Sequence, residues 1–528
     1  MKDFWTIQCF VLTLVVCLTS VTMLTYIQSF LHSRHTEANR GEEPPIPPYY
    51  VPYLQHLLSF LSNPSKTFRT YNKIYGGRPF TLLMMNTKFY VYHDPKTCNH
   101  VFARSRVFVF EPVLASMMEN GMAVPPADMP KFQLPSHAGV EEKDSASFVV
   151  ANHKLWLRYL SGKSLENIMN VYTDLFYKTI ESHLDLGTSA WQMVNLHELL
   201  RKLVFETSVA TFFGPRIWKL WPKIWDDFNE FNKTTYIGVR TNAAYSFRPR
   251  ARKARERMLL AFEEWINHDV AETWSEDDGE WNETWGTKLN WERELQARQF
   301  GFSRRGRACL HASFLFVAVV NALPLVAWFT WCATSSAERL ERFLLEATKF
   351  MVPSGIHNRH KMQIHSTALK ENAWVQGLWK EALRLGTAGA AARVVMETSE
   401  LEGYLLQKGS VILMPAALMH YDERFFPDPD KVKPERWILG SEADAESVDL
   451  LQQRQRSLRP FGGGTGLCSG RFVAENEIIG IVSALLLLFD IKFEESWYQG
   501  YRFNPRSIGF MESMNEETAY LRRRKEHA

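Results

Sequence analysis

The sequence contains few cysteines and almost no excess charge. Its 528 residues include six cysteines, which are scattered along the chain and form no C-x-x-C pair. Such spacing favours neither a disulfide framework nor a zinc ribbon. The formal net charge of +3 gives no reason to expect a nucleic-acid partner. What remains is a chain of ordinary globular composition, long enough for one large domain or roughly two to four smaller ones.

Charge is absent from Phe4 to Leu31 near the N-terminus. A helix of about 20 apolar residues crosses a bilayer, so this run is long enough to span one. A cleaved signal peptide is the alternative, but the length of the run and the lack of an A-x-A cleavage site favour a retained helix. Arg34 and Arg40 follow the run and only Lys2 precedes it, which by the positive-inside rule places the rest of the chain in the cytosol. We predict a membrane anchor over residues 1–31.

Proline dominates the next segment, where Pro44–Tyr53 reads PPIPPYYVPY. Such a run excludes helix and favours a stiff extended spacer. We therefore predict a basic and proline-rich linker over residues 32–53. No later stretch has the composition of a linker, and the acidic run Ser275–Gly286 is expected to be a solvated loop. Residues 54–528 are expected to form a single large domain.

Hydrophobic periodicity predicts that this domain is mainly α-helical with a small β-sheet. Apolar residues recur at helical spacing in three long stretches, and three short runs have the character of strands. The expected helices cover residues 337–351, 374–385 and 471–489, and the expected strands cover residues 80–85, 88–93 and 410–415.

A glycine-rich loop, RPFGGGTGLCSGRF, carries a single cysteine. No lysine follows at the spacing of a phosphate loop, and the third glycine of a dinucleotide fingerprint is missing. What remains is F-x-x-G-x-x-x-C-x-G, formed by Phe461, Gly464, Cys468 and Gly470. Glycines let the backbone lie against a flat macrocycle and point N–H groups at the sulfur, and the helix that begins near Gly470 also favours the thiolate. Phe461 can pack beside the sulfur and exclude water. The pattern favours Cys468 as a haem-iron ligand; an inert, buried cysteine is the alternative.

Three further motifs accompany this loop. KEALRL carries Glu381 and Arg384, which share a helix face at i and i+3 and can form an ion pair. KPERW carries Arg436, and LMHYDERFFPDP contains the pattern H-x-D-x-x-x-x-P-D-P. Together with the Cys468 loop, these motifs resemble the cytochrome P450 family of haem-thiolate monooxygenases. The resemblance runs from the anchor to the end of the chain.

The resemblance implies a cytochrome P450 fold preceded by one N-terminal transmembrane helix. It also implies that haem b is bound with Cys468 as the axial ligand of the iron. Implied cofactor-binding residues are Cys468, Phe461, Gly464, Gly470 and Arg393, the last at a haem propionate; implied structural residues are Glu381, Arg384 and Arg436.

One branch of the family is particularly similar. ALRLGTAGAAAR, LMHYDERFFPDP and the N-x-x-P motif within Phe316–Trp331 look like the sterol 7α-hydroxylase and prostacyclin synthase group. Pro324 of this motif would remove a backbone hydrogen bond and kink the long central helix. A second membrane span is the alternative for this apolar run, but its asparagine, its proline and the preceding RRGR favour a buried helix.

The sequence departs from the family pattern in three places. Gly466 stands where members often carry Arg or His at a haem propionate. The usual W-x-x-x-R of an early helix is absent, and the candidates left open for a second propionate contact are His153, Lys154, Trp156 and Arg158. The acid–alcohol pair of the central helix is replaced by Asn321 and Ala322, which are our candidates for the catalytic distal positions.

The expected function is that of a membrane-anchored monooxygenase. The resemblance implies hydroxylation or another oxidation of a lipophilic substrate, such as a sterol, a terpenoid or another secondary-metabolite intermediate. The oxidation would use O2 and electrons that NADPH–cytochrome P450 reductase supplies from NADPH. The catalytic domain would lie in the cytosol, held by a single-pass anchor in the endoplasmic reticulum membrane. Two alternatives stay open: an isomerase or dehydratase that needs no reductase, and a non-catalytic haem- or sterol-binding membrane protein.

Overall fold

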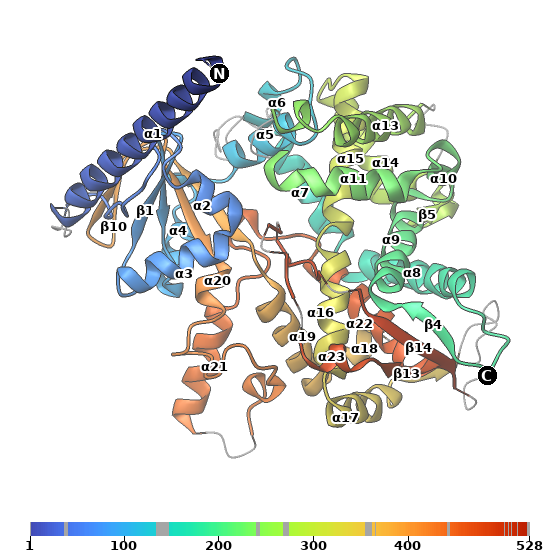
Figure 1. Ribbon diagram of the computed structural model, residues 1–528. Helices are drawn as coiled ribbons and strands as arrows, with labels where there is room; N and C mark the ends of the chain where they lie inside the picture. The colour runs from blue at the N-terminus through green and yellow to red at the C-terminus, as the bar shows by residue number, and fades with distance from the viewer. Residues whose placement is uncertain are drawn as a thin grey trace. The chain divides into compact units, whose positions relative to one another are not determined.

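The chain folds mainly into helices with several small sheets, as the sequence predicts (Figure 1). A computed structural model describes residues 2–35, 41–133, 147–238, 243–267, 274–353, 362–364, 366–440, 444–500, 502–504, 506–507, 509–514 and 516–524. Its contacts divide the chain into two compact units. The first comprises Met1–Phe110, Ala388–Asp422 and Gly462–Gly466, and the second comprises Glu111–Thr387, Glu423–Phe461 and Leu467–Ala528. Each unit therefore combines segments that lie far apart in the sequence.

The first unit is built on a five-stranded sheet of order β1-β2-β12-β9-β3. Its elements are α1 (Lys2–His35), α2 (Leu57–Ser62), α3 (Pro64–Ile74), β1 (Phe80–Met84), β2 (Thr87–Val91), α4 (Pro95–Ala103), β3 (Phe108–Val109), β9 (Ala390–Val395), β10 (Ser399–Leu401), β11 (Tyr404–Leu406), β12 (Val411–Pro415), α20 (Ala416–Met419) and η3 (Gly464–Gly466). Strand β12 pairs in parallel with β2 and antiparallel with β9, where Ile412 lies opposite Arg393. The register matters because it places Arg393 on a central strand.

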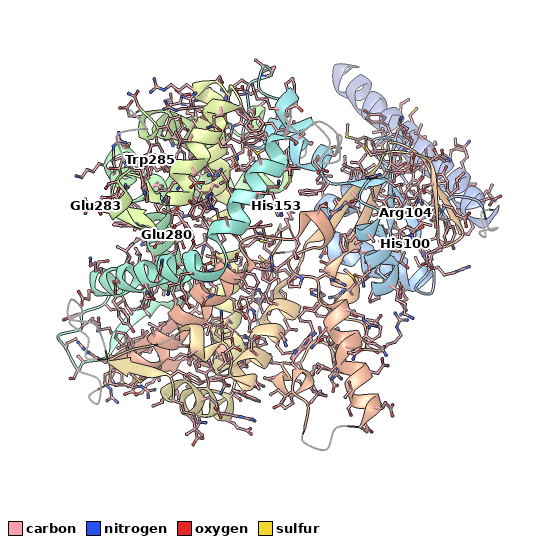
Figure 2. All side chains as sticks on the ribbon, turned by 180° about the vertical axis from the view of Figure 1, so that it is seen from behind. His100, Arg104, His153, Glu280, Glu283 and Trp285 are labelled. Carbon is pink, nitrogen blue, oxygen red and sulfur yellow. The ribbon has the colours of Figure 1, made fainter. Side chains whose placement is uncertain are left out.

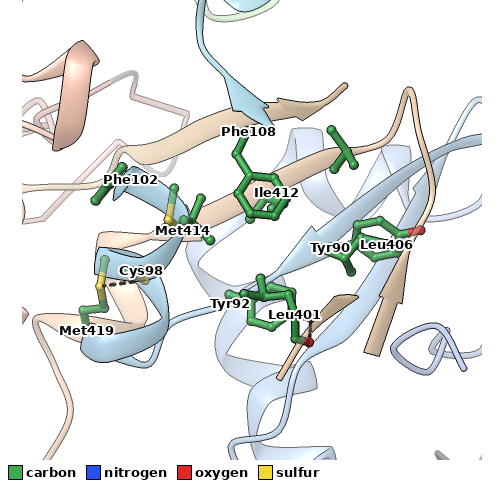
Figure 3. Packing of buried hydrophobic residues seen from close by; sticks show 12 residues of the cluster. Tyr90, Tyr92, Cys98, Phe102, Phe108, Leu401, Leu406, Ile412, Met414 and Met419 are labelled. Carbon is green, nitrogen blue, oxygen red and sulfur yellow. Dashed lines mark hydrogen bonds between the residues drawn. The ribbon is translucent and has the colours of Figure 1, made fainter. Parts of the chain in front are cut away.

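Buried side chains from both halves of the sequence form the core beside this sheet. Tyr90 and Tyr92 pack with Phe108, Ile412 and residues of α4, as Figure 3 shows. Strand β12 is buried along most of its length because its alternate side chains pack into two hydrophobic clusters, Ile412 and Met414 into one and Leu413 into the other. The core thus fixes β9 and α4, the elements that carry Arg393 and Phe102.

The N-terminal anchor sequence forms a single helix, α1, of 34 residues. Its apolar part, Val15–Leu31, carries mostly exposed side chains. The following segment, residues 41–53, contains no helix, but it is not a free spacer. The backbone oxygen of Pro44 accepts a hydrogen bond from Thr81 Oγ1 (2.6 Å), and that of Pro45 accepts one from Thr81 N (2.8 Å). The proline-rich segment therefore lies along strand β1.

The second unit is largely helical. Its helices are α5 (Glu111–Asn120), α6 (Pro130–Gln133), α7 (Phe148–Tyr159), α8 (Gly162–His183), α9 (Leu196–Phe213), α10 (Arg216–Leu220), α11 (Ile224–Gly238), α12 (Ala243–Ser246), α13 (Pro249–Trp265), η1 (Glu276–Asp278), α14 (Lys288–Gln299), α15 (Arg304–Val319), α16 (Ala322–Thr334), α17 (Ala337–Thr348), α18 (Ser366–Leu369), α19 (Ala373–Gly386), η2 (Pro434–Trp437), α21 (Ala445–Ser457), α22 (Arg471–Leu488) and α23 (Glu495–Tyr498). Its strands are β4 (Gln192–Asn195), β5 (Trp281–Asn282), β6 (Gly286–Thr287), β7 (Met351–Pro353), β8 (Met362–Ile364), β13 (Phe489–Phe493) and β14 (Thr518–Arg523).

The central apolar run is a buried helix pair, as the sequence favours. Helices α15 and α16 follow one another through the second unit (Figure 1). Among the residues that the structure describes, Arg304–Thr334 is the segment long and apolar enough to cross a membrane, and 78% of its apolar 18-residue stretch is buried inside the protein. Burial against protein explains its hydropathy without a second membrane crossing.

The acidic run Ser275–Gly286 was expected to be a solvated loop, and this expectation is wrong for part of it. Strands β5 and β6 form a short hairpin there, and Trp285 is fully buried. Its ring lies edge-on to Trp265, with 4.9 Å between the centroids. Figure 2 shows Trp285 beside Glu280 and Glu283 on this segment. The burial of one large aromatic ring outweighs the acidic composition of its neighbours.

Candidate haem-binding site

The glycine-rich loop presents the thiol of Cys468 at the start of α22. The backbone N–H of Cys468 donates to the carbonyl of Phe461 (3.1 Å), which closes the turn. Gly470 is the N-cap of α22, and the Cys468 side chain is exposed. Although the side chain is exposed, the protein atoms around it desolvate the thiolate and raise the pKa of the Cys468 thiol, whereas the backbone N–H groups of Gly470 and Arg471 lower it. The first effect is larger, so these N–H groups alone do not make a thiolate.

The glycines before Cys468 permit a close approach to α4 within the first unit. Gly464 has φ +62°, and a Cβ atom there would lie 3.0 Å from the carbonyl oxygen of Phe102. Positive φ and this contact together require glycine. The loop therefore lies flat against Phe102, while the predicted packing of the Phe461 ring beside the sulfur stays a prediction.

Arg393 is held in the same part of the first unit. Its guanidinium is buried between the rings of Phe102 and Phe110, with Cζ 5.0 and 5.2 Å from their centroids. Its Nη2 donates to the carbonyl of Gly463 (2.7 Å). A Cβ atom on Gly466 would come within 3.0 Å of the same Nη2. Arg393 thus lies close against Gly466, the position at which the sequence departs from the family pattern.

The early helix of the second unit brings a histidine to the cysteine loop. His153 on α7 (Figure 2) has its Nδ1 3.3 Å from Oγ of Ser469, the residue after Cys468. Burial lowers the pKa of His153, and the charge of Arg471 lowers it further. Arg158 instead donates to Glu292 (2.9 Å), and the Trp156 indole donates to Asn152 (3.3 Å). Of the four early-helix candidates, the described contacts bring His153 to the loop.

Glu381 and Arg384 form a fully buried ion pair on α19. Arg384 donates to both carboxylate oxygens, each at 2.8 Å, in the fork geometry that favours arginine. Arg436, on η2, places its Nε 3.8 Å from Glu381 and donates from Nη2 to the carbonyl of Asp428 (2.7 Å). The three residues that the family resemblance assigns to one network are therefore brought together.

The central helix is interrupted at Val320 and Asn321, between α15 and α16. Pro324 has no N–H to donate to the carbonyl of Val320, which accounts for the break one turn earlier. The side chain of Asn321 accepts a hydrogen bond from the backbone N–H of Phe510 (3.3 Å). Ala322 is buried and offers no polar side-chain atom. Neither candidate for the distal catalytic positions therefore presents a side-chain group that titrates near neutral pH.

One buried acid escaped the sequence analysis. Glu477 on α22 is 2% exposed and accepts a hydrogen bond from Ser208 Oγ (3.3 Å), beside the Tyr172 hydroxyl. Burial raises the pKa of its carboxyl to about 8, so it is mostly protonated at pH 7. The available signal was that Glu477 directly precedes the apolar run Ile478–Leu488 of this helix, which is interrupted only by Gly480 and Ser483.

This shift predicts a pH-dependent stability. Between the ordinary carboxyl value of 4.5 and about 8, the folded chain keeps a proton that the unfolded chain loses. The contribution of Glu477 to the free energy of unfolding therefore falls with rising pH in that window, by up to about 1.4 kcal/mol per pH unit. Glu477→Gln should remove this slope in urea unfolding series at pH 6, 7 and 8. Identical slopes for the two proteins would contradict the assignment.

The cysteine loop fits haem better than a metal ion bound by side chains alone. Over the described part of the chain, no group of three or more His, Cys, Asp or Glu side chains is placed to hold a metal ion. A single thiol between glycines, with N–H groups directed at its sulfur, suits an iron whose remaining ligands come from a macrocycle.

Comparisons with known proteins decide the family. A family model described as Cytochrome P450 matches residues 356–501. Cytochrome P450 monooxygenase poxD of Penicillium oxalicum is 22% identical, over 85% of this chain and 87% of its own length. Cytochrome P450 7A1 of Oryctolagus cuniculus is 22% identical, over 87% of this chain and 88% of its own. The chain belongs to the cytochrome P450 family.

A solved structure supports the fold of this P450 along nearly its whole length. Retinoic acid bound cyanobacterial CYP120A1 superposes with a TM-score of 0.68 and 16% identity, covering 92% of this chain and all of the other. The predicted fold class is thereby confirmed. The similarity to cytochromes P450 7A1 and 7B1 also confirms the predicted branch.

Proposed function

We propose that this P450 is a membrane-bound monooxygenase that hydroxylates or otherwise oxidises a lipophilic substrate with O2 and electrons from NADPH–cytochrome P450 reductase. The observation that supports the proposal is the Cys468 loop, which places one exposed thiol at the N-terminus of α22. An iron-bound thiolate supplies the electron density that promotes O–O cleavage.

Three residues of this chain are proposed to contact the cofactor. Cys468 is the proposed axial ligand, and coordination to iron would favour the thiolate over the thiol despite the raised pKa. Arg393 is the proposed partner of one haem propionate, and His153 is the candidate for the other. Glu381, Arg384 and Arg436 would act at a distance, by fixing α19 and the segment around η2.

The substrate class follows from the relatives. One of them is named 25-hydroxycholesterol 7-alpha-hydroxylase, of Rattus norvegicus, at 21% identity over 63% of this chain. Others are named as fungal cytochrome P450 monooxygenases. We propose a sterol, a terpenoid or a related secondary-metabolite intermediate as the substrate.

The isomerase alternative is favoured by a specific observation. Asn321 and Ala322 replace the acid–alcohol pair that the family uses to deliver protons, a contribution of roughly 10²–10⁴ in rate. The oxygenase then depends on a substrate hydroxyl or on ordered water near the helix break. An isomerase or dehydratase would need no proton delivery to O2.

Reductase dependence should separate the two reactions. For the oxygenase, product should form from lipophilic candidates only with O2, NADPH and reductase, and Ala322→Thr should keep or improve the ratio of product to NADPH consumed. The measurement is product by mass spectrometry alongside NADPH oxidation. Product from a peroxide substrate without O2 or reductant, unaffected by Ala322→Thr, would overturn the oxygenase proposal in favour of the isomerase.

Membrane attachment is proposed to be single-pass, in the endoplasmic reticulum, with the catalytic domain cytosolic. Deleting residues 1–43 should release the protein from carbonate-resistant attachment, because α1 carries the apolar run. Phe247, 86% exposed and followed by exposed Arg248 and Arg250, should preserve weaker binding to anionic vesicles. Phe247→Ser in the truncated protein should remove this residual binding in flotation assays. Carbonate-resistant attachment of the truncated protein would contradict the anchor.

A further inference from the structure

The break in the central helix contacts a hairpin near the C-terminus. Within the described residues of 502–514, Asn504 N donates to the carbonyl of Glu512 (2.9 Å), and Met514 N donates to that of Arg502 (2.8 Å). Phe503 and Ser513 form a bridge between these two bonds. We call the described residues 502–504, 506–507 and 509–514 the C-terminal hairpin. It lies in the same unit as α15 and α16.

Asn321 packs directly on the backbone of this hairpin. Its Oδ1 accepts the N–H of Phe510 (3.3 Å), and Phe510 itself is buried. Gly509 has φ +78°, and a Cβ atom there would collide with the Asn321 amide, lying 3.0 Å from its Cγ. The hairpin therefore requires glycine at 509 both for its backbone conformation and for its contact with Asn321.

A second contact lies on the same face of α16. Trp328, seven residues after Asn321, donates its indole N–H to the carbonyl of Met511 (2.9 Å). Residues spaced by seven lie on one helix face, so α16 holds the hairpin at two points. From α19, the carbonyl of Gly386 accepts the N–H of Met511 (2.7 Å). Hydrogen bonds to Asn321, Trp328 and Gly386 thus hold the hairpin beside the helix break.

The hairpin also reaches α11. Asn232 donates from Nδ2 to the Glu512 side chain (3.0 Å). On α15, Val317 is 47% exposed although most of this helix is buried, and it precedes Asn321 by four residues on the same face. Val317 is thus an exposed apolar side chain one helical turn before Asn321.

We infer that Asn321 is a positioning residue: it holds the C-terminal hairpin against the helix break and does not itself deliver protons. Its acceptor oxygen is engaged by the Phe510 N–H, and a carboxamide does not titrate near neutral pH. The hairpin that it holds lies beside the helix break, where Trp328 also contacts it. The inference rests on the proposed function only in expecting a haem ligand to bind near the helix break.

Two substitutions at position 321 separate holding the hairpin from proton delivery. Asn321→Asp keeps an oxygen that can accept the Phe510 N–H, whereas Asn321→Leu has a similar volume and no acceptor. In amide hydrogen exchange of the haem-loaded protein, the peptide that carries Phe510 should exchange about five- to tenfold faster in the leucine variant and remain protected in the aspartate variant. Gln376→Leu is the control, because Gln376 on α19 contacts Glu475 rather than the hairpin.

Binding of 4-phenylimidazole supplies a second readout, followed by the Soret shift of the haem. The dissociation constant should rise several-fold for Asn321→Leu and be restored by Asn321→Asp. The inference would be overturned if the Phe510 peptide exchanged at an unchanged rate in Asn321→Leu. It would also be overturned if Asn321→Asp raised the ratio of product to NADPH consumed while the hairpin stayed protected in both variants. Amide exchange requires no turnover, so it can be measured even if the oxygenase proposal fails. Failure of that proposal can therefore be told apart from failure of this inference.

Discussion

Replacing Cys468 with alanine should abolish the red-shifted absorption band of the reduced carbon monoxide complex and all reductase-driven turnover. Cys468 is the proposed ligand of the haem iron, and a methyl group in place of its thiol cannot ligate a metal. The backbone of the loop should survive, because the Cys468 N–H bond to Phe461 and the glycine contacts with Phe102 do not involve the sulfur. We therefore expect a folded variant without thiolate ligation.

The matched control is Cys332→Ala. Cys332 is fully buried on α16, and burial raises the pKa of its thiol, so it serves as core packing rather than as a ligand. This variant should lose a little stability and retain the red-shifted band. Difference spectra with haem content per chain are the measurement. Retention of the band in the Cys468 variant would contradict the central assignment.

Motifs with local physical causes were predictable from the sequence. Helix α19 follows from apolar periodicity between residues 374 and 385, and it ends one residue later. The i and i+3 spacing of Glu381 and Arg384 is itself a statement about geometry, since one helical turn brings them together. The role of the Cys468 loop could be predicted because a lone cysteine among glycines fits only a few kinds of site, of which a haem-iron ligand matched the spacing.

Contacts between distant segments could not be read from spacing. Phe510 lies 189 residues after Asn321, and no local pattern pairs an asparagine with that backbone N–H. Ser469 likewise meets His153 across 316 residues, so the early-helix candidates stayed open until the fold placed them. The burial of Trp285 was not predicted because the composition of a segment is an average over its residues, whereas each side chain is buried or exposed individually.

Breaking the buried network at Glu381 should cost far more stability than breaking a surface ion pair of the same spacing. The Glu381 carboxylate is fully buried and accepts four hydrogen bonds: two from Arg384, one from the Trp437 indole (2.9 Å) and one from Lys433 N (2.9 Å). Glutamine has the same shape but replaces one acceptor by an N–H group, which would face another donor. The Arg384 charge would then lie buried without its counterion, at a cost of about 3–5 kcal/mol.

A matched pair on α8 supplies the comparison. Lys163 and Glu166 also stand at i and i+3. Their charged atoms lie 2.7 Å apart, close to the 2.8 Å between Arg384 and Glu381, but their side chains are 78% and 48% exposed. Glu166→Gln should therefore cost about 0–1 kcal/mol. Urea unfolding and haem content report both effects. If Glu381→Gln does not fold, Arg384→Lys should give a measurable intermediate, because lysine keeps the charge and loses the fork. If Glu381→Gln and Glu166→Gln lost the same free energy of unfolding, burial would not be what makes the Glu381 pair important, because the two pairs share their spacing and differ strongly only in burial.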